Sequence, residues 1–159
     1  MFVRILLFSL VVVALTLGSF YWYHTTKNQV WWPNSIDKVV FYSIDGRGTK
    51  EVNEKEYEKY FHKFPVVGEV ELTGEDRSSL LTALNQGIAE GFAKASCFWP
   101  RHGIRIERAG QTTDYVICFY CKFMEVHNSD GRKIVMTSDR PKAVFNQLLS
   151  KYELPLVPE

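Results

Sequence analysis

The chain opens with a continuous apolar run, before the apolar positions change to alternating and helical spacing. No charged residue occurs from Ile5 to Tyr23, a length that fits the roughly 20 apolar residues needed to cross a bilayer. Arg4 precedes the run, and aromatic residues close it as they do at membrane interfaces. We therefore predict a transmembrane signal anchor in residues 1–24, with a cytoplasmic N-terminus, and a tether over residues 25–35.

A cleaved signal peptide is the alternative interpretation of this run. Ile5–Leu17 has the length of a signal h-region, and the small residues up to Gly18 could be cut. We favour the anchor because the aromatic residues extend the run past that site. Either interpretation puts the following domain outside the cytoplasm, on a single-pass membrane protein or as a secreted or periplasmic protein after cleavage. A buried helix of a cytosolic protein is the least favoured of the three.

Residues 36–159 begin with two segments typical of strands. Lys38–Ile44 is rich in β-branched and aromatic residues and stops at a glycine-rich turn, so we predict a strand. Val66–Leu72 alternates apolar and polar positions, as a half-exposed strand does. Between them, the loosely spaced apolar residues of Glu51–His62 suggest a short helix.

A longer helix should follow the second strand. Thr73 and Asp76 have the spacing of a capping box, in which the hydroxyl accepts the backbone N–H three residues on. Gly91 could end the helix. The apolar residues that recur at helical spacing between these ends are Leu80, Leu81, Leu84, Ile88 and Phe92.

The rest of the domain is predicted to be a three-stranded meander and a final helix. The three strands would be Ile104–Arg108, Asp114–His127 and Arg132–Thr137. Ser138 or Asp139 could cap the helix, with Pro141 in its first turn. Its sheet-facing residues would be Ala143, Val144, Leu148, Leu149 and Tyr152. We therefore predict an α+β fold, with an N-terminal transmembrane helix followed by one domain, in which two main helices pack on an antiparallel sheet.

Charge and motifs narrow the function only in part. The chain has 19 Lys and Arg residues against 18 Asp and Glu residues, a balance unsuited to electrostatic binding of nucleic acid. No G-x-S-x-G, H-E-x-x-H, Walker or Rossmann pattern occurs. No catalytic residue is therefore assigned, and no organic cofactor is expected.

The chain has three cysteines, and hairpin pairing could bring them together. If Arg108 pairs with Thr113, then Cys118 and Cys121 face the segment that contains Cys97 and His102. A tetrahedral zinc site of these four residues is then conceivable. A disulfide from Cys97 to Cys121 or Cys118 is plausible outside the cytoplasm.

An unbroken strand would work against either site. Residues three apart in a strand point to opposite faces and lie about 10 Å apart, beyond disulfide reach. The favoured interpretation of Cys118 and Cys121 is therefore structural burial without a site. The other interpretations are, in decreasing order of preference, a disulfide with Cys97, a zinc site and catalytic thiol–disulfide exchange. Convergence of the three sulfurs would favour the last two.

Arg101 and Arg105 flank a histidine and could together contact a carboxylate or phosphate. We prefer the simpler interpretation, a loop that enters a strand with Arg105 on a solvated face.

The segments CFWPRHGIR from Cys97 and DYVICFYC from Asp114 resemble a pattern of small uncharacterised bacterial exported or membrane-tethered proteins. This resemblance implies a bacterial extracytoplasmic domain. It transfers no activity and no catalytic residue, but it groups Cys97, His102, Cys118 and Cys121 as a unit.

The sequence therefore predicts a membrane-tethered extracytoplasmic module that binds a protein or small ligand or serves a structural role. The membrane, reached through residues 5–23, is its other predicted partner. The alternative is a thiol- or zinc-dependent enzyme or redox domain that uses Cys97, Cys118, Cys121 and His102.

Overall fold

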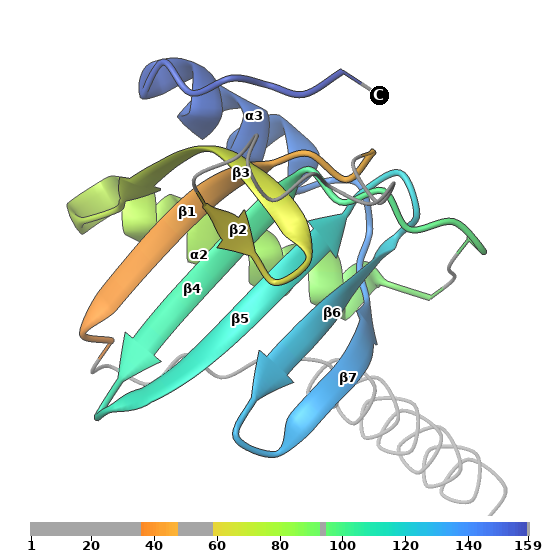
Figure 1. The fold of residues 1–159 in the computed structure, drawn as a ribbon, viewed down its shortest axis with the longest axis horizontal. Helices are drawn as coiled ribbons and strands as arrows, with labels where there is room; N and C mark the ends of the chain where they lie inside the picture. Colours follow the sequence, from red (N-terminus) through yellow and green to blue (C-terminus); the bar gives the residue numbers. More distant parts are fainter. Residues whose placement is uncertain (1–35, 48–58, 93–94, 159) are drawn as a thin grey trace, which may run out of the picture.

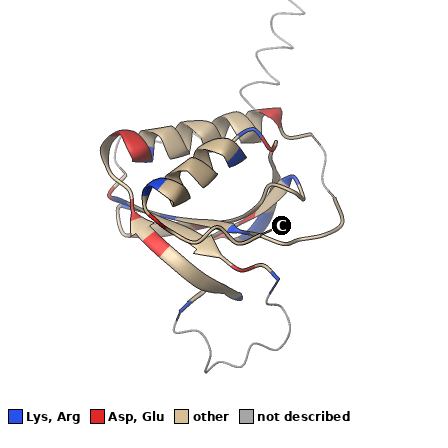
Figure 2. Ribbon diagram, turned by 90° about the horizontal axis from the view of Figure 1, so that it is seen from above, with Lys and Arg blue, Asp and Glu red and all other residues tan. Residues whose placement is uncertain are grey.

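The structure is a computed structural model that describes residues 36–47, 59–92 and 95–158. Within these residues, seven strands form one antiparallel sheet in the order β2-β3-β1-β4-β5-β6-β7 (Figure 1). Helices α2 (Gly74–Glu90) and α3 (Lys142–Lys151) lie on the same side of the sheet (Figure 2). The strands are β1 Lys38–Ile44, β2 Tyr60–Phe61, β3 Phe64–Glu71, β4 His102–Arg108, β5 Gln111–Cys118, β6 Phe123–Asn128 and β7 Gly131–Met136.

Strand alternation divides the core into clusters on the two sides of the sheet. On β1, Val39 and Phe41 belong to the cluster that includes the buried residues of α2 and α3. Val40 and Tyr42 belong to a second cluster, with Phe61 from the short β2–β3 hairpin. Strand β1 is therefore buried on both faces, because the helices cover one side and the hairpin covers the other.

A two-residue turn sets the register between β4 and β5. Ala109 and Gly110 both have positive φ, 47° and 76°, as the favoured two-residue hairpin turns require. Arg108 therefore pairs with Gln111, and Gly103 pairs with Val116. The register predicted from the sequence, with Arg108 opposite Thr113, is wrong because Gln111 already belongs to the strand.

The predicted long strand Asp114–His127 is also wrong, since it is two strands joined by a tight turn. Strand β5 ends at Cys118 and β6 begins at Phe123. Lys122 closes the connection with φ at 58° and donates its N–H to the Phe119 carbonyl at 3.1 Å. Strands β4 to β7 therefore form a meander of four strands, where the sequence predicted three.

The ends of both helices differ from the predicted caps. Thr73 precedes α2, but its side chain makes no capping hydrogen bond. Pro141 holds the N-cap position of α3, and no side chain caps that helix. Phe92, predicted to continue the apolar face of α2, is 89% exposed. In α3 the largest buried side chain is Phe145, which the predicted sheet-facing set omitted.

The predicted fold class, α+β with an N-terminal transmembrane helix, is corrected by these findings. The described residues form a curved antiparallel sheet of seven strands with two helices on one face. Among them, no helix is long and apolar enough to span a bilayer. The segment predicted to cross the membrane, residues 5–23, and the tether, residues 25–35, lie outside the described residues. So does most of the helix predicted at Glu51–His62, of which Tyr60 and Phe61 form β2.

Replacing Gly91 by alanine should destabilise the fold, because α2 ends against the β7–α3 connection. A Cβ at Gly91 would lie 2.5 Å from the Met136 carbonyl carbon and 2.6 Å from the Thr137 nitrogen. Its φ of −68° suits alanine, so no backbone strain adds to the loss of packing. We expect Gly91→Ala to lower the free energy of unfolding by about 1–3 kcal/mol, measured by denaturant titration. Ser79→Ala, on the exposed side of α2, is the matched control, and equal stability of the two variants would contradict the prediction.

Candidate functional site

The turn after β5 brings two of the three cysteines together. Cys118 and Cys121 form a disulfide, with their Cα atoms 5.2 Å apart. In an unbroken strand the same residues would be about 10 Å apart, so the bond depends on the turn. Both sulfurs are buried, beside the Phe123 ring. The sequence had instead considered Cys97 as the disulfide partner.

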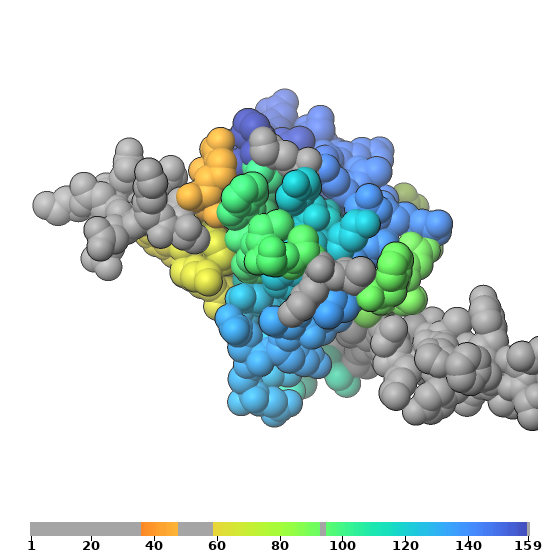
Figure 3. Space-filling view, turned by 90° about the vertical axis from the view of Figure 1, so that its right-hand side faces the viewer, coloured from red at the N-terminus to blue at the C-terminus, as the bar shows by residue number. Residues whose placement is uncertain are grey.

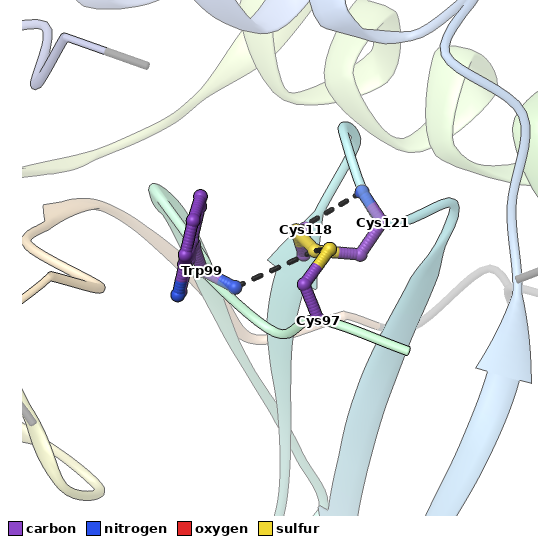
Figure 4. The surroundings of a disulfide bond; sticks show 4 residues. All are labelled: Cys97, Trp99, Cys118 and Cys121. Atoms are coloured by element: carbon purple, nitrogen blue, oxygen red, sulfur yellow. Dashed lines mark hydrogen bonds between the residues drawn. A yellow bond between two sulfur atoms is a disulfide. The ribbon is translucent and has the colours of Figure 1, made fainter. Parts of the chain in front are cut away.

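Cys97 remains a thiol and reaches the same place from the segment before β4. Its Sγ lies 3.4 Å from Cys121 Sγ, and its side chain is half-buried. Backbone contacts hold this segment against the turn, since the Ala95 N–H bonds the Cys121 carbonyl at 2.9 Å. The Trp99 N–H also points to Cys121 Sγ, at 3.4 Å (Figure 4). The three sulfurs therefore converge. This convergence is the feature that was expected from the sequence to favour a zinc site or thiol–disulfide exchange over simple burial.

His102 does not join the sulfurs, because it lies on the other face of the sheet. It lies two residues before Ile104 and therefore on the same, helix-covered face of β4. There it contacts the rings of Phe119 and Phe145. Cys118 lies on the opposite face of the neighbouring strand. Among the residues that the structure describes, no group of His, Cys, Asp or Glu side chains is arranged to hold a metal. A zinc site built from His102 and the cysteines therefore has no geometric support.

His102 instead lines a pocket between the sheet, α3 and the C-terminal segment. Its Nε2 lies 3.0 Å from Asn146 Oδ1. The pocket has a volume of about 170 Å³. In Figure 3 the green segment around residues 97–103 and the cyan turn at residues 118–122 adjoin on the surface, with the blue of α3 and the C-terminal segment above them. The lining residues are Trp99, Arg101, His102, Phe119, Tyr120, Lys142, Asn146, Leu156, Val157 and Pro158.

The disulfide-bonded turn supplies part of the pocket wall. Phe119 and Tyr120 occupy the two positions between Cys118 and Cys121. Phe119 turns into the core, whereas Tyr120 is 62% exposed and stacks on Trp99, with ring centroids 6.5 Å apart and planes within 9°. The pocket and the sulfur cluster therefore share one short segment of chain.

Positive charge gathers at this pocket. Arg101 is buried and donates from Nη1 to the Val157 carbonyl at 2.8 Å. The hydroxyl of Ser43 also donates to the Pro155 carbonyl, so two bonds hold the C-terminal segment in place as a wall. Lys142 lines the pocket as well, and none of the described residues that line it is acidic. The pocket is thus apolar in its walls, and the charged side chains among its described lining residues are cationic.

Arg105, the second arginine considered for anion contact, lies elsewhere. Its Nε and Nη2 donate to the two carboxylate oxygens of Asp114 at 2.8 and 2.7 Å. This bidentate pair raises the pKa of Arg105 above its ordinary value. Arg101 and Arg105 therefore do not act together on one anion.

Asp114 belongs to a polar network on the side of the sheet away from the helices. His62, at the β2–β3 turn, lies with Nε2 3.0 Å from Asp114 Oδ2. Its ring stacks on His127 with centroids 3.9 Å apart. His127 in turn lies 3.3 Å from Glu125, which also pairs with Arg132 at 3.0 Å. These polar contacts satisfy one another, which is typical of a structural network.

Sequence reasoning missed the residues that complete the pocket. Lys142 and Asn146 are four apart, so they share one face of α3, and that spacing was a usable signal. The C-terminal residues 156–158 carry no comparable signal in the sequence.

No family model, curated protein or solved structure matches the chain.

His62 should make folding stability depend on pH. Burial lowers the pKa of His62 below 6.5, and the charge of His127 lowers it further, whereas Asp114 opposes the shift. The unfolded chain then binds this proton at higher pH than the folded chain does. Stability is therefore lost as pH falls below about 6.5. We expect His62→Asn to flatten the decline in unfolding free energy between about pH 7 and pH 5, measured by denaturation at several pH values. Parallel profiles for the two proteins would contradict this assignment.

Proposed function

We propose that the domain is a binding module whose pocket takes a small ligand with a flat apolar part and an anionic group. The observation that carries the proposal is the composition of the pocket. Aromatic rings of Trp99, Phe119 and Tyr120 form its apolar walls, and Arg101 and Lys142 supply cations. Ligand sites in proteins commonly combine apolar walls with a few placed polar groups.

The volume of the pocket suits a ligand part of about one ring system. A closed apolar cavity of about 150 Å³ holds benzene, and this pocket measures about 170 Å³. Trp99 and Tyr120 are 53% and 62% exposed, so a flat ligand that covers them would remove apolar surface from water. Stacking against aromatic rings adds to that gain.

The charges select the polar end of the ligand. A carboxylate that reaches Lys142 or Arg101 would gain hydrogen bonds to a charged donor, which are stronger than neutral ones. No acidic side chain among the described lining residues opposes this. An aromatic or similarly flat carboxylate is therefore the ligand class that we infer.

The uncharged run at residues 5–23 supports a proposal for the location of the module. We propose that this run attaches the protein to a membrane and that the binding domain lies outside the cytoplasm. The disulfide between Cys118 and Cys121 supports this location, because such bonds persist in oxidising compartments.

Benzoate and its neutral counterpart benzamide test the ligand class. We expect the full-length protein to bind benzoate more tightly than benzamide, measured by calorimetry. Lys142→Gln should weaken benzoate binding by about tenfold, because it removes a charged hydrogen-bond donor, and leave benzamide binding unchanged. Lys133→Gln removes the same charge from exposed strand β7 and is the matched control. Equal affinity for both probes, or equal effects of the two substitutions, would contradict the proposal.

Deleting residues 1–24 tests the membrane attachment. We expect the full chain to remain with the membrane fraction after alkaline carbonate extraction, because an apolar run of about 20 residues is held in hydrocarbon rather than by surface charge. The shortened chain should appear in the supernatant. Release of the full chain by carbonate would refute the attachment.

A further inference from the structure

We propose that Cys97, Cys118 and Cys121 form a thiol–disulfide exchange site, in which Cys97 opens the buried disulfide and presents it to a low-molecular-weight thiol. This activity goes beyond ligand binding in the neighbouring pocket and does not depend on it. It rests on the positions of the three sulfurs, on the groups that contact them and on their different exposure.

The attacking and attacked sulfurs are already in contact. Cys97 Sγ lies 3.4 Å from Cys121 Sγ, and Cys121 is bonded to Cys118. Thiol–disulfide exchange proceeds by attack of a thiolate on one sulfur of a disulfide. The structure thus assigns Cys97 as nucleophile, Cys121 as the central sulfur and Cys118 as the leaving sulfur.

Backbone N–H groups are placed to support this division of roles. The Cys121 N–H donates to Cys118 Sγ at 3.1 Å, and the same bond would stabilise negative charge on Cys118 as it leaves. The Trp99 N–H donates to Cys121 Sγ at 3.4 Å and holds the central sulfur toward the Cys97 segment (Figure 4). Hydrogen bonds to an anionic form favour that form.

Exposure explains why a third cysteine is needed. Cys118 and Cys121 are buried, so a thiol from solution cannot approach their bond directly. Cys97 is half-buried, and it can carry one end of a disulfide to the surface. Since only part of this side chain is open, a small thiol fits better than a cysteine in a folded protein.

The internal step balances without an outside reagent. The Cys97 thiolate forms a bond to Cys121 Sγ, the bond between Cys121 and Cys118 breaks, and Cys118 leaves as a thiolate that takes up the proton lost by Cys97. One disulfide and one thiol are present before and after the step.

The outward step transfers two electrons. One external thiolate attacks Cys97 Sγ and forms a mixed disulfide, and Cys121 leaves as a thiolate and is protonated. A second external thiolate attacks the sulfur of the bound external thiol, and Cys97 leaves. Two external thiols are thus oxidised to one disulfide, and the protein disulfide is reduced to two thiols. An excess of the oxidised external disulfide reverses both steps.

Trapping the central pair tests the internal step. In full-length Cys118→Ser, we expect Cys97 and Cys121 to form a disulfide under mild oxidation, detected by alkylation, digestion and mass spectrometry. Two alkylated thiols in that variant would overturn the assignment of Cys97 as the nucleophile.

Reaction with glutathione tests the outward step. We expect glutathione to reduce the wild-type disulfide through a mixed disulfide between glutathione and Cys97. It should reduce the disulfide of Cys97→Ser on the order of a hundredfold more slowly, because a positioned group reacts at a high effective concentration. The double variant Cys97→Ser with Ser96→Cys moves the thiol by one residue along the exposed segment and keeps the thiol count. It should react as slowly as Cys97→Ser. Equal rates in all three proteins, or a double variant as fast as wild type, would overturn the proposal.

Discussion

The tight turn from Phe119 to Lys122 is the constraint on which the other features of this domain depend. It ends β5 and starts β6, so it converts one long apolar segment into two paired strands. It also closes the distance between Cys118 and Cys121 to bonding range. Because the disulfide joins the last residue of β5 to a residue within the turn, the bond removes conformational freedom mainly from the unfolded chain. The turn and the bond therefore support each other.

Local pattern predicted the elements whose stability comes from alternation or helical spacing. Strand β1 and helix α2 were found close to their expected ends, because β1 is a short run of strand-forming residues that stops at a turn and the apolar positions of α2 follow the helical period. Pattern failed where a turn interrupts an apolar stretch. Tyr115 to Val126 is largely apolar on both faces in the sequence, which an unbroken buried strand would also produce. The positive φ of Lys122 marks the break. A glycine or asparagine at this position would have indicated a turn, but a lysine does not.

The candidate sites were harder to predict than the strands because they depend on register and on distant segments. A two-residue shift in the β4–β5 pairing changes which residues are neighbours, but it keeps each residue on its face of the sheet. Face, rather than register, separates His102 from Cys118. The pocket joins the segment before β4, the first residue of β4, the β5–β6 turn, α3 and the C-terminal segment. Spacing within one segment cannot reveal a site assembled from five.

Trp99 and Tyr120 connect the two sites physically. Trp99 contacts a sulfur through its backbone N–H and lines the pocket with its ring. Tyr120 lies between two cysteines and stacks on that ring. Moving the bond from Cys118 to Cys97 would release the turn at one end and tie it to the Trp99 segment at the same time. If this movement alters the wall of the pocket, a ligand that shifts the pairing of the sulfurs by some factor has its own affinity shifted by the pairing by the same factor, because coupling between two binding equilibria is reciprocal. Each site can still act without the other, since neither shares its reacting atoms with the other.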